Sequence, residues 1–484
     1  MNYSMIFNII GKVLGVEAVL MLPALVIALC CAEPQAAMGL GLAIAAMAAV
    51  GLPLGLRRPK NTDMFARDGL AAVCLTWLAV SVFGALPFLI SGAIPNFIDC
   101  LFETVSGFTT TGATILNDIE AVPKGLLYWR SFTHWLGGMG VLVFLLILNP
   151  LSEKNSGENM HLLRAESPGI RISKLVPRMK NSAAILYLIY IALTVLEMVL
   201  LLLGGMPVFD AVTLSYGTAG TGGFGVLNDS VASYSAYCQW VITVFMLLFS
   251  VNFNVYFLLL IGRFRKALKN EELALFAAIV LGSIVLICIN VRDMFESLGE
   301  LVRHVSFQVA SIVSTTGFGT VDFDQWPQFS RTLMVALMFC GACAGSTGGG
   351  AKVVRILVSA KSAFRSVHRV IKPNAVRLVH MDGEVLSEDT VNSVSAYMLI
   401  YFLIMAVAVL LVSLDGPDLE TNFTAVVSCM NNIGPGLGAV GPTMNYACYS
   451  GGAKIVLLLS MLIGRLEIYP MLLLFIPYVW RKHR

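Results

Sequence analysis

The chain has 484 residues, of which 57% are hydrophobic and only 13% are charged, and its net charge is +3. Soluble domains carry about 25% charged residues, so this composition excludes an ordinary soluble protein. Apolar runs of roughly 20 residues, the length that crosses a bilayer, recur from end to end. The sequence therefore predicts an all-α polytopic membrane protein.

Residues 1–67 predict an N-terminal extension of two membrane-spanning helices, roughly Ile9–Cys30 and Ala36–Leu56. The apolar run Val13–Leu29 is too long for the core of a cleavable signal, and a second run follows at once. No copy of the motif described below lies in this extension, so we interpret it as an added pair of spans.

Four units follow, and we expect each to contain a span, a helix too short to cross, a loop and a second span. Their expected bounds are 68–150, 151–265, 266–360 and 361–484. The expected first spans are Ala71–Ile90, Ala183–Leu203, Ala274–Ile289 and Val394–Val412. The expected short helices lie near Asn96–Val105, Val208–Tyr216, Leu298–Ile312 and Thr421–Met430. The expected second spans are Trp129–Leu148, Gln239–Ile261, Thr332–Val358 and Ile455–Ile476.

A glycine-centred motif follows the short helix of every unit. It reads SGFTTTGAT at Ser106–Thr114, YGTAGTGGFG at Tyr216–Gly225, SIVSTTGFGT at Ser311–Thr320 and MNNIGPGLG at Met430–Gly438. Alignment on Gly112, Gly222, Gly317 and Gly434 superimposes the four copies, and such a regular recurrence indicates repeat architecture. The third copy is close to the TVGYG loop of potassium channels, whose backbone carbonyls replace an ion's hydration shell. The sequence thus predicts a cation filter whose four quarters come from one chain.

Backbone carbonyls and threonine hydroxyls would supply the oxygens of this filter. The candidate K⁺-binding residues are Thr110, Thr111, Gly112, Gly220, Thr221, Gly222, Thr315, Thr316, Gly317, Asn432, Ile433 and Gly434. Each short helix would direct the partially negative end of its dipole at the ion. The other interpretation is that Gly and Thr merely let membrane helices pack closely, and the fourfold recurrence in one setting favours the filter.

Charge in the loops predicts the orientation of the chain. Basic residues gather in the loops 57–67, 154–180, 263–269 and 361–377 and at the terminal residues 481–484, which the positive-inside rule places in the cytoplasm. We expect both termini there and the filter loops outside. The loops on the outer side carry Asp99, Glu103, Asp118, Glu120, Asp210, Asp229, Asp322, Asp324, Asp415, Asp418 and Glu420. Such an acidic mouth would concentrate cations.

Ser346, Thr347, Gly348, Gly349 and Gly350 interrupt the second span of the third unit. Broken membrane helices mark binding sites and moving parts, and three consecutive glycines disfavour a helix. We expect a flexible loop just below the filter that opens or blocks the pore. A passive kink is the alternative.

Arg465 lies inside the apolar run Ile455–Ile476. A charge at this depth is costly and should face water or the bundle interior. We interpret it as a constriction residue below the filter. An ion pair with Glu467 or another acid, or snorkelling to the interface, are the alternatives.

Several soluble-protein motifs in the chain lack the context that they require. Both GxGxxG matches, at Gly220–Gly225 and Gly436–Gly441, lack a βαβ unit. The segment Gly345–Lys352 resembles a phosphate loop, but Ala351 and Val353 break the pattern. The six histidines are dispersed and Cys340-x-x-Cys343 has no partner pair, so no enzyme is expected. A symporter with alternating access is the remaining alternative, although inverted repeats, which would favour it, are not expected here.

Taken together, these motifs resemble the Trk/Ktr/HKT superfamily of potassium transporters, and within it the TrkH-type membrane subunits. The resemblance covers essentially the whole chain and rests on the four loops and on Trp135–Gly140, Ala344–Gly350, Asn431–Gly436 and Gly464–Glu467. The N-terminal pair of spans also fits this type. One departure is Ala351, where isoleucine is commoner in the family.

The resemblance implies a pseudo-fourfold pore in each subunit, a homodimer and conduction of K⁺ and Rb⁺, without an organic cofactor in this chain. It implies a bacterial inner-membrane location and a cytosolic TrkA-type ring of nucleotide-binding subunits that gates the pore. By the same resemblance, Gly345–Gly350 and Arg465 would form the gate. Some plant relatives carry serine at the first filter glycine and prefer Na⁺, so glycine at all four positions favours K⁺.

Overall fold

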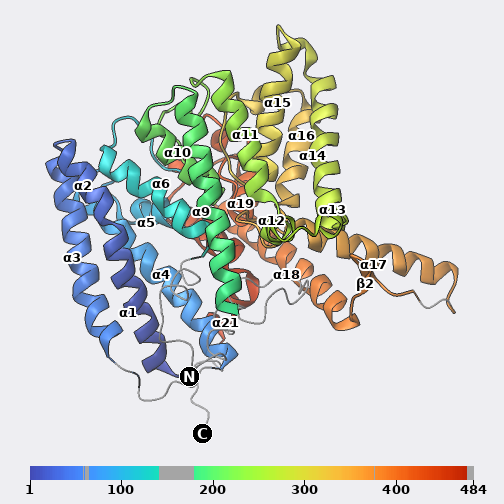
Figure 1. Cartoon of the computed structure of the whole chain (residues 1–484), viewed down its shortest axis with the longest axis horizontal. Helices are drawn as coiled ribbons and strands as arrows, with labels where there is room; N and C mark the ends of the chain where they lie inside the picture. Colours follow the sequence, from blue (N-terminus) through green and yellow to red (C-terminus); the bar gives the residue numbers. More distant parts are fainter. Residues whose placement is uncertain (58, 60–64, 141–178, 375–376, 477–484) are drawn as a thin grey trace.

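The computed structural model of the chain describes residues 1–57, 59, 65–140, 179–374 and 377–476 (Figure 1). These residues form helices, apart from one two-stranded hairpin and the connecting loops. Among them, six helices are long and apolar enough to cross a membrane, or seven if one bent pair is a single span. The predicted all-helical membrane architecture is confirmed.

The N-terminal extension consists of α1 (Tyr3–Leu20), α2 (Leu22–Cys30) and α3 (Pro34–Leu56). The first two form a nearly continuous apolar span that is interrupted at Met21, just before Pro23 enters the first turn of α2. Glycines let α1 and α3 approach closely, because a Cβ added to Gly11 would lie only 2.4 Å from the backbone nitrogen of Gly55.

Along the chain the other helices follow one order four times: a long helix, a short helix with its loop, and a second helix. The long helices are α4 (Ala66–Ile90), α9 (Met179–Leu203), α14 (Glu271–Asn290) and α18 (Glu388–Val412). The short helices are α5 (Phe97–Phe108), α10 (Val208–Gly220), α15 (Leu298–Val313) and α19 (Leu419–Asn431). Side-chain oxygens of Asn96, Ser297 and Asp418 cap three of the short helices by accepting backbone N–H groups.

The second helices are more broken than expected. They are α6 (Lys124–Gly138), α11 (Ala236–Ser250) with α12 (Phe253–Leu260), α16 (Gln328–Cys340) with α17 (Val353–Ile371), and α20 (Gly451–Leu466) with α21 (Ile468–Phe475). The expected break in the third unit is present, and its non-helical loop covers residues 341–352. The end of the expected span Trp129–Leu148 lies outside the described residues.

The expectation of unbroken spans Gln239–Ile261 and Ile455–Ile476 is wrong. Helices α11 and α12 meet at 90°, and Asn252 caps α12 with its side chain. The N–H of Phe253 donates to Gly345 O at 3.0 Å, so a tertiary contact with the loop of the third unit supports this bend. Between α20 and α21 the backbone of Glu467 has φ +66°. A right-handed helix requires a negative φ, so α20 ends at this residue.

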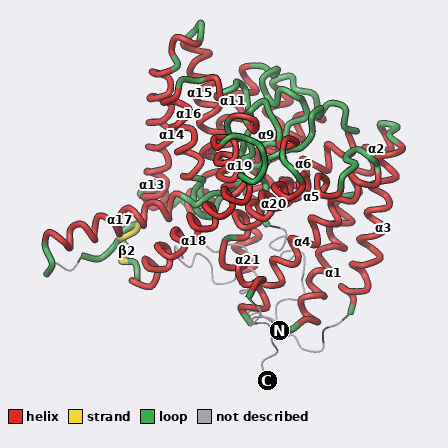
Figure 2. The backbone as a smooth tube through the Cα atoms, turned by 180° about the vertical axis from the view of Figure 1, so that it is seen from behind, coloured by secondary structure: helices red, strands yellow, loops and turns green. Residues whose placement is uncertain are grey.

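Connecting elements complete the fold. They are α13 (Phe264–Leu268), the antiparallel strands β1 (His380–Met381) and β2 (Glu384–Val385), and the 3₁₀ turns η2 (Arg292–Met294), η3 (Phe323–Gln325), η4 (Gly438–Val440) and η5 (Tyr446–Cys448). Helix α17 projects sideways from the body (Figure 1). Figure 2 shows the long loops gathered at the end of the molecule away from the N-terminus. The expected basic residues at 154–178 and 481–484, with Arg58 and Lys60, lie outside the described residues.

Candidate ion pathway

The four short helices end in loops of one conformation. The first turning residue has a left-handed backbone in every unit, and two residues later a glycine also has a positive φ. The turning residues are Thr110 (φ +55°), Thr221 (+54°), Thr315 (+60°) and Asn432 (+54°). The glycines are Gly112 (φ +79°), Gly223 (+75°), Gly317 (+88°) and Gly434 (+102°). Four repeats of a conformation that is uncommon for non-glycine residues indicate a functional constraint.

This geometry corrects the register of the second loop. The N–H of Gly222 donates to Gly217 O at 2.8 Å, as the N–H of Thr111 donates to Ser106 O at 2.8 Å. Gly222 is therefore equivalent to Thr111, and the glycine equivalent to Gly112 is Gly223. Sequence alignment was ambiguous because two glycines are adjacent there. Gly220, one of the predicted filter residues, lies farther back, where an added Cβ would be 2.3 Å from His134 O.

The four loops contact one another in cyclic order. An added Cβ on Gly112 would lie 2.0 Å from Gly222 O, on Gly223 2.0 Å from Thr316 O, on Gly317 2.0 Å from Ile433 O, and on Gly434 2.8 Å from Thr111 O. Each glycine thus packs on the carbonyl that precedes the next unit's glycine, where no side chain fits. The structure brings together all the predicted filter residues except Gly220.

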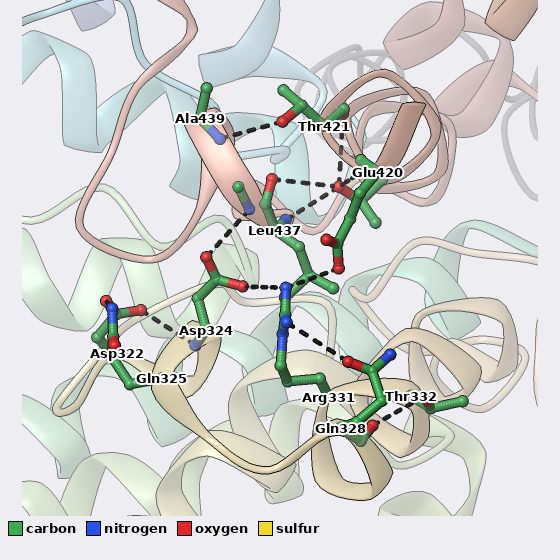
Figure 3. Close-up of polar contacts among 12 residues, drawn as sticks. Asp322, Asp324, Gln325, Gln328, Arg331, Thr332, Glu420, Thr421, Leu437 and Ala439 are labelled. Atoms are coloured by element: carbon green, nitrogen blue, oxygen red, sulfur yellow. Dashed lines mark hydrogen bonds and ion pairs between the residues drawn. The ribbon is translucent and has the colours of Figure 1, made fainter. Parts of the chain in front are cut away.

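The acidic mouth carries less free charge than the sequence suggested. Lys454 binds Asp99 at 2.7 Å, and the buried Arg130 binds Glu103 at 2.6 Å. Figure 3 shows Arg331 between Asp324 and Glu420, at 2.8 and 2.7 Å. These ion pairs offset the negative charge of the carboxylates, so the mouth attracts cations less strongly than the number of acidic residues implies.

The outer loops also join neighbouring units. Asn228 of the second unit donates to Asp118 of the first at 2.9 Å and accepts from the N–H of Ile119 at 2.7 Å. The hydrogen bond from Asn228 lowers the pKa of Asp118. Val231 N–H donates to Gly319 O between the second and third units, and Asn445 donates to Asn117 between the fourth and first units at 2.9 Å.

The broken segment of the third unit, residues 341–352, lies directly against the short-helix ends of the third and fourth units. We call it the intramembrane loop. Gly349 N–H donates to Thr315 Oγ1 at 2.7 Å. An added Cβ on Gly348 would lie 3.0 Å from Ser314 O, and one on Gly349 2.6 Å from Asn431 O. The glycines therefore allow this loop to approach the filter loops closely.

Arg465 binds the intramembrane loop. Its Nη1 donates to Thr347 O at 2.7 Å, and its Nη2 donates to Gly137 O at 2.5 Å and Gly138 O at 2.8 Å. Glu467 instead binds Arg355 at 2.5 Å, and the Arg355 guanidinium lies 4.0 Å from the Tyr397 ring centroid. Backbone carbonyls of the first and third units therefore solvate the Arg465 charge.

A buried ion pair that was not predicted from the sequence, Arg130 with Glu103, lies behind the first two loops. Arg130 is 2% exposed. It binds Glu103, donates to Gly225 O at 3.0 Å and lies 3.5 Å from the Phe224 ring centroid. Glu103 also accepts from Thr114 Oγ1 and from the N–H of Ile115. Arg130 is a charged residue inside an apolar segment, and this feature, which identified Arg465, could have identified Arg130 too.

Known proteins of one family match this chain over nearly its whole length. The family model TrkH, described as a cation transport protein, matches residues 35–291 and 292–482. The chain is 37% identical over 434 residues to the Trk system potassium uptake protein TrkH of Salmonella typhimurium, with 88% of each chain covered. It is 34% identical over 497 residues to the TrkH of Vibrio parahaemolyticus, with both chains fully covered. The crystal structure of the potassium transporter TrkH from Vibrio parahaemolyticus matches with a TM-score of 0.88 and 32% identity, over 99% of this chain and 100% of that chain.

Proposed function

Because the chain belongs to the TrkH family of cation transport proteins, we propose that its four glycine-centred loops form the filter through which it takes up potassium. Its relatives are named as potassium uptake proteins, so the chain is a multi-pass membrane transporter of potassium rather than an enzyme. K⁺ is the cargo of this pathway. Among the described residues, no group of three or more His, Cys, Asp and Glu side chains could hold a metal ion.

The main support for this proposal is that the four loops contact one another in a closed ring. Potassium that leaves water needs several oxygens, and carbonyls on neighbouring loops can supply them without net charge. The C-terminal ends of α5, α10, α15 and α19 add partial negative charge at the same place. We assign the filter to 110–112, 221–223, 315–317 and 432–434, with Gly223 in place of Gly220. Rb⁺, which resembles K⁺ in size, would pass as well.

We propose that the intramembrane loop, with Gly345, Ser346, Thr347, Gly348, Gly349 and Gly350, and Arg465 form the gate. Two contacts support this assignment: the loop binds Thr315, and Arg465 binds the loop through Thr347 O. A loop of glycines can rearrange with little steric cost, and a fixed positive charge beside the pathway opposes cation passage.

The wider setting is proposed on family grounds. The chain would form a homodimer in the bacterial inner membrane, with both termini cytoplasmic and a TrkA-type nucleotide-binding ring below it. The pore would have a pseudo-fourfold axis, with the repeats divided at 67, 150, 265 and 360. The N-terminus lies at the end of the molecule away from the long loops seen in Figure 2, which suits this orientation.

Rubidium flux into vesicles that contain the purified chain tests the filter assignment. We expect Gly317→Ser to reduce Rb⁺ flux at least tenfold or to lose the preference for K⁺ over Na⁺, because its Cβ would meet Ile433 O at 2.0 Å. The matched control is Gly319→Ser, two residues away, whose Cβ has no neighbour nearer than 3.9 Å. Equal flux and selectivity in both variants would refute the filter assignment, and absence of Rb⁺ flux in the wild type would refute the transport proposal.

A further inference from the structure

The buried carboxylate of Glu272 joins the two ends of the intramembrane loop. Glu272 lies in the first turn of α14 and is 0% exposed. Its Oε1 accepts the N–H of Ala344, early in the loop, at 2.6 Å, and the N–H of Val354, in the first turn of α17, at 3.2 Å. One oxygen thus fixes the distance between the start of the loop and the helix that follows it.

The hairpin β1–β2 binds the helix end that carries Glu272. Asp382, at the tip of the hairpin, accepts the N–H of Glu271 at 2.8 Å and the side-chain amide of Asn270 at 3.1 Å. Lys361 of α17 binds Glu271 and donates to His380 O at 2.8 Å. The exposed tip of the hairpin is therefore bonded to the residue adjacent to Glu272.

The same hairpin also packs on the intramembrane loop itself. Met381 is 3% exposed and forms an apolar cluster with Ala344 and Val354. These are the two residues whose N–H groups Glu272 binds. The hairpin, the start of α14 and both ends of the loop therefore meet at one place, which we call the loop anchor (Glu272, Ala344, Val354, Met381 and Asp382).

We propose that Glu272 is a positioning residue that keeps the intramembrane loop beneath the filter, and that Asp382 of the hairpin secures this hold from the cytosolic side. The inference rests on the proposed gating role of the loop. Releasing the loop would leave a buried carboxylate and two backbone N–H groups without partners, which is costly. A force on the exposed hairpin would move the start of α14, and with it the acceptor that both loop ends share.

Flux and thiol reactivity together test the loop anchor in vesicles that contain the whole chain. We expect Glu272→Ala to raise basal Rb⁺ flux about tenfold, because the acceptor of two hydrogen bonds is lost, and to leave the ratio of Rb⁺ to Na⁺ flux unchanged. Cys343 of the loop is 1% exposed. We expect its labelling by a small methanethiosulfonate, read by peptide mass spectrometry, to rise in the same variant.

Three further single substitutions and one double variant separate positioning from a general structural role. Glu272→Gln keeps an acceptor oxygen and should restore low flux and low Cys343 labelling. Asp382→Ala, on the surface, should raise both readouts without disturbing a buried site, whereas Glu384→Ala on the same exposed hairpin should change neither. In the double variant Glu272→Ala/Asp382→Ala, the effects should be less than additive, because both act on one anchor.

Each result decides for or against the inference. The inference is overturned if Cys343 labelling is unchanged in both Glu272→Ala and Asp382→Ala while the wild type conducts Rb⁺. The filter proposal would then still stand. A Glu272→Gln protein as leaky as Glu272→Ala would overturn it too, since the acceptor oxygen would then not be what holds the loop. If Glu272→Ala does not assemble, Asp382→Ala still decides.

Discussion

Two arginines below the filter have different partners, and their partners suggest their roles. Arg355 is paired with Glu467 and packs on Tyr397, so its charge is balanced inside the protein. Arg465 donates to three backbone carbonyls, from the intramembrane loop and from the end of α6. These carbonyls come from two different units, so Arg465 joins the intramembrane loop to the end of α6.

We expect Arg465→Gln to raise basal Rb⁺ flux roughly tenfold, since hydrogen bonds from a charged donor contribute about 1.5–3 kcal/mol and the barrier charge is also removed. The measurement is initial Rb⁺ uptake into vesicles at matched protein density. Arg265→Gln, an exposed arginine on α13, is the control and should leave uptake unchanged. Uptake by Arg465→Gln equal to that of the wild type would contradict the gating role.

At the scale of elements, the outer loops and short helices hold neighbouring units together. Asp324, in the η3 turn, accepts the N–H of Gly438 at 3.2 Å. Gly438 lies four residues after the filter glycine Gly434. Arg331 of α16 bonds both Asp324 and Glu420 of α19 (Figure 3). The third and fourth units are therefore aligned by one ionic cluster just outside the filter.

Arg331→Ala should weaken this alignment. We expect the free energy of unfolding to fall by about 1 kcal/mol, the usual scale for a partly exposed ion-pair network, and the half-saturating Rb⁺ concentration to rise about twofold to fivefold. Thermal unfolding in detergent and concentration-dependent uptake measure the two effects, and Arg292→Ala, an exposed charge in the η2 turn, is the control. Because salt screens exposed charges, the stability difference should shrink in 1 M salt, and a difference independent of salt would argue against an ionic cause.

Apolar runs predicted the ends of the long and short helices to within six residues, because apolar length largely determines both. The bend at Asn252 was not predictable from the apolar run around it, because the hydrogen bond that supports it joins Phe253 to Gly345, 92 positions away in the chain. The predicted alignment of the second loop on Gly222 was wrong for a similar reason. The left-handed turn at Thr221, the hydrogen bond from Gly222 to Gly217 O and the contact of Gly223 with Thr316 O distinguish the two adjacent glycines, and all three require the folded structure.

At the scale of the molecule, the filter loops and the loop anchor contact different residues of the intramembrane loop. The filter contacts the loop at Gly348 and Gly349, and the anchor contacts it at Ala344. Selectivity and gating would thus be separate properties of one pathway, with the loop as their shared boundary. Variants of the loop anchor should therefore change flux without changing ion preference, whereas filter variants such as Gly317→Ser should lower flux or change ion preference.

Native cysteines make the proposed orientation testable. Cys31 and Cys448 are exposed; Cys31 is close to Glu33, which binds the start of α6, and Cys448 lies in η5, whose Tyr446 N–H donates to Thr114 O of the first filter loop. An impermeant maleimide added to intact cells should therefore label Cys31 and Cys448 from outside. A cysteine placed at Glu384 on the hairpin should react only after the membrane is permeabilised. Labelling of the hairpin in intact cells would place the filter loops in the cytoplasm and reverse the direction in which the pathway opens.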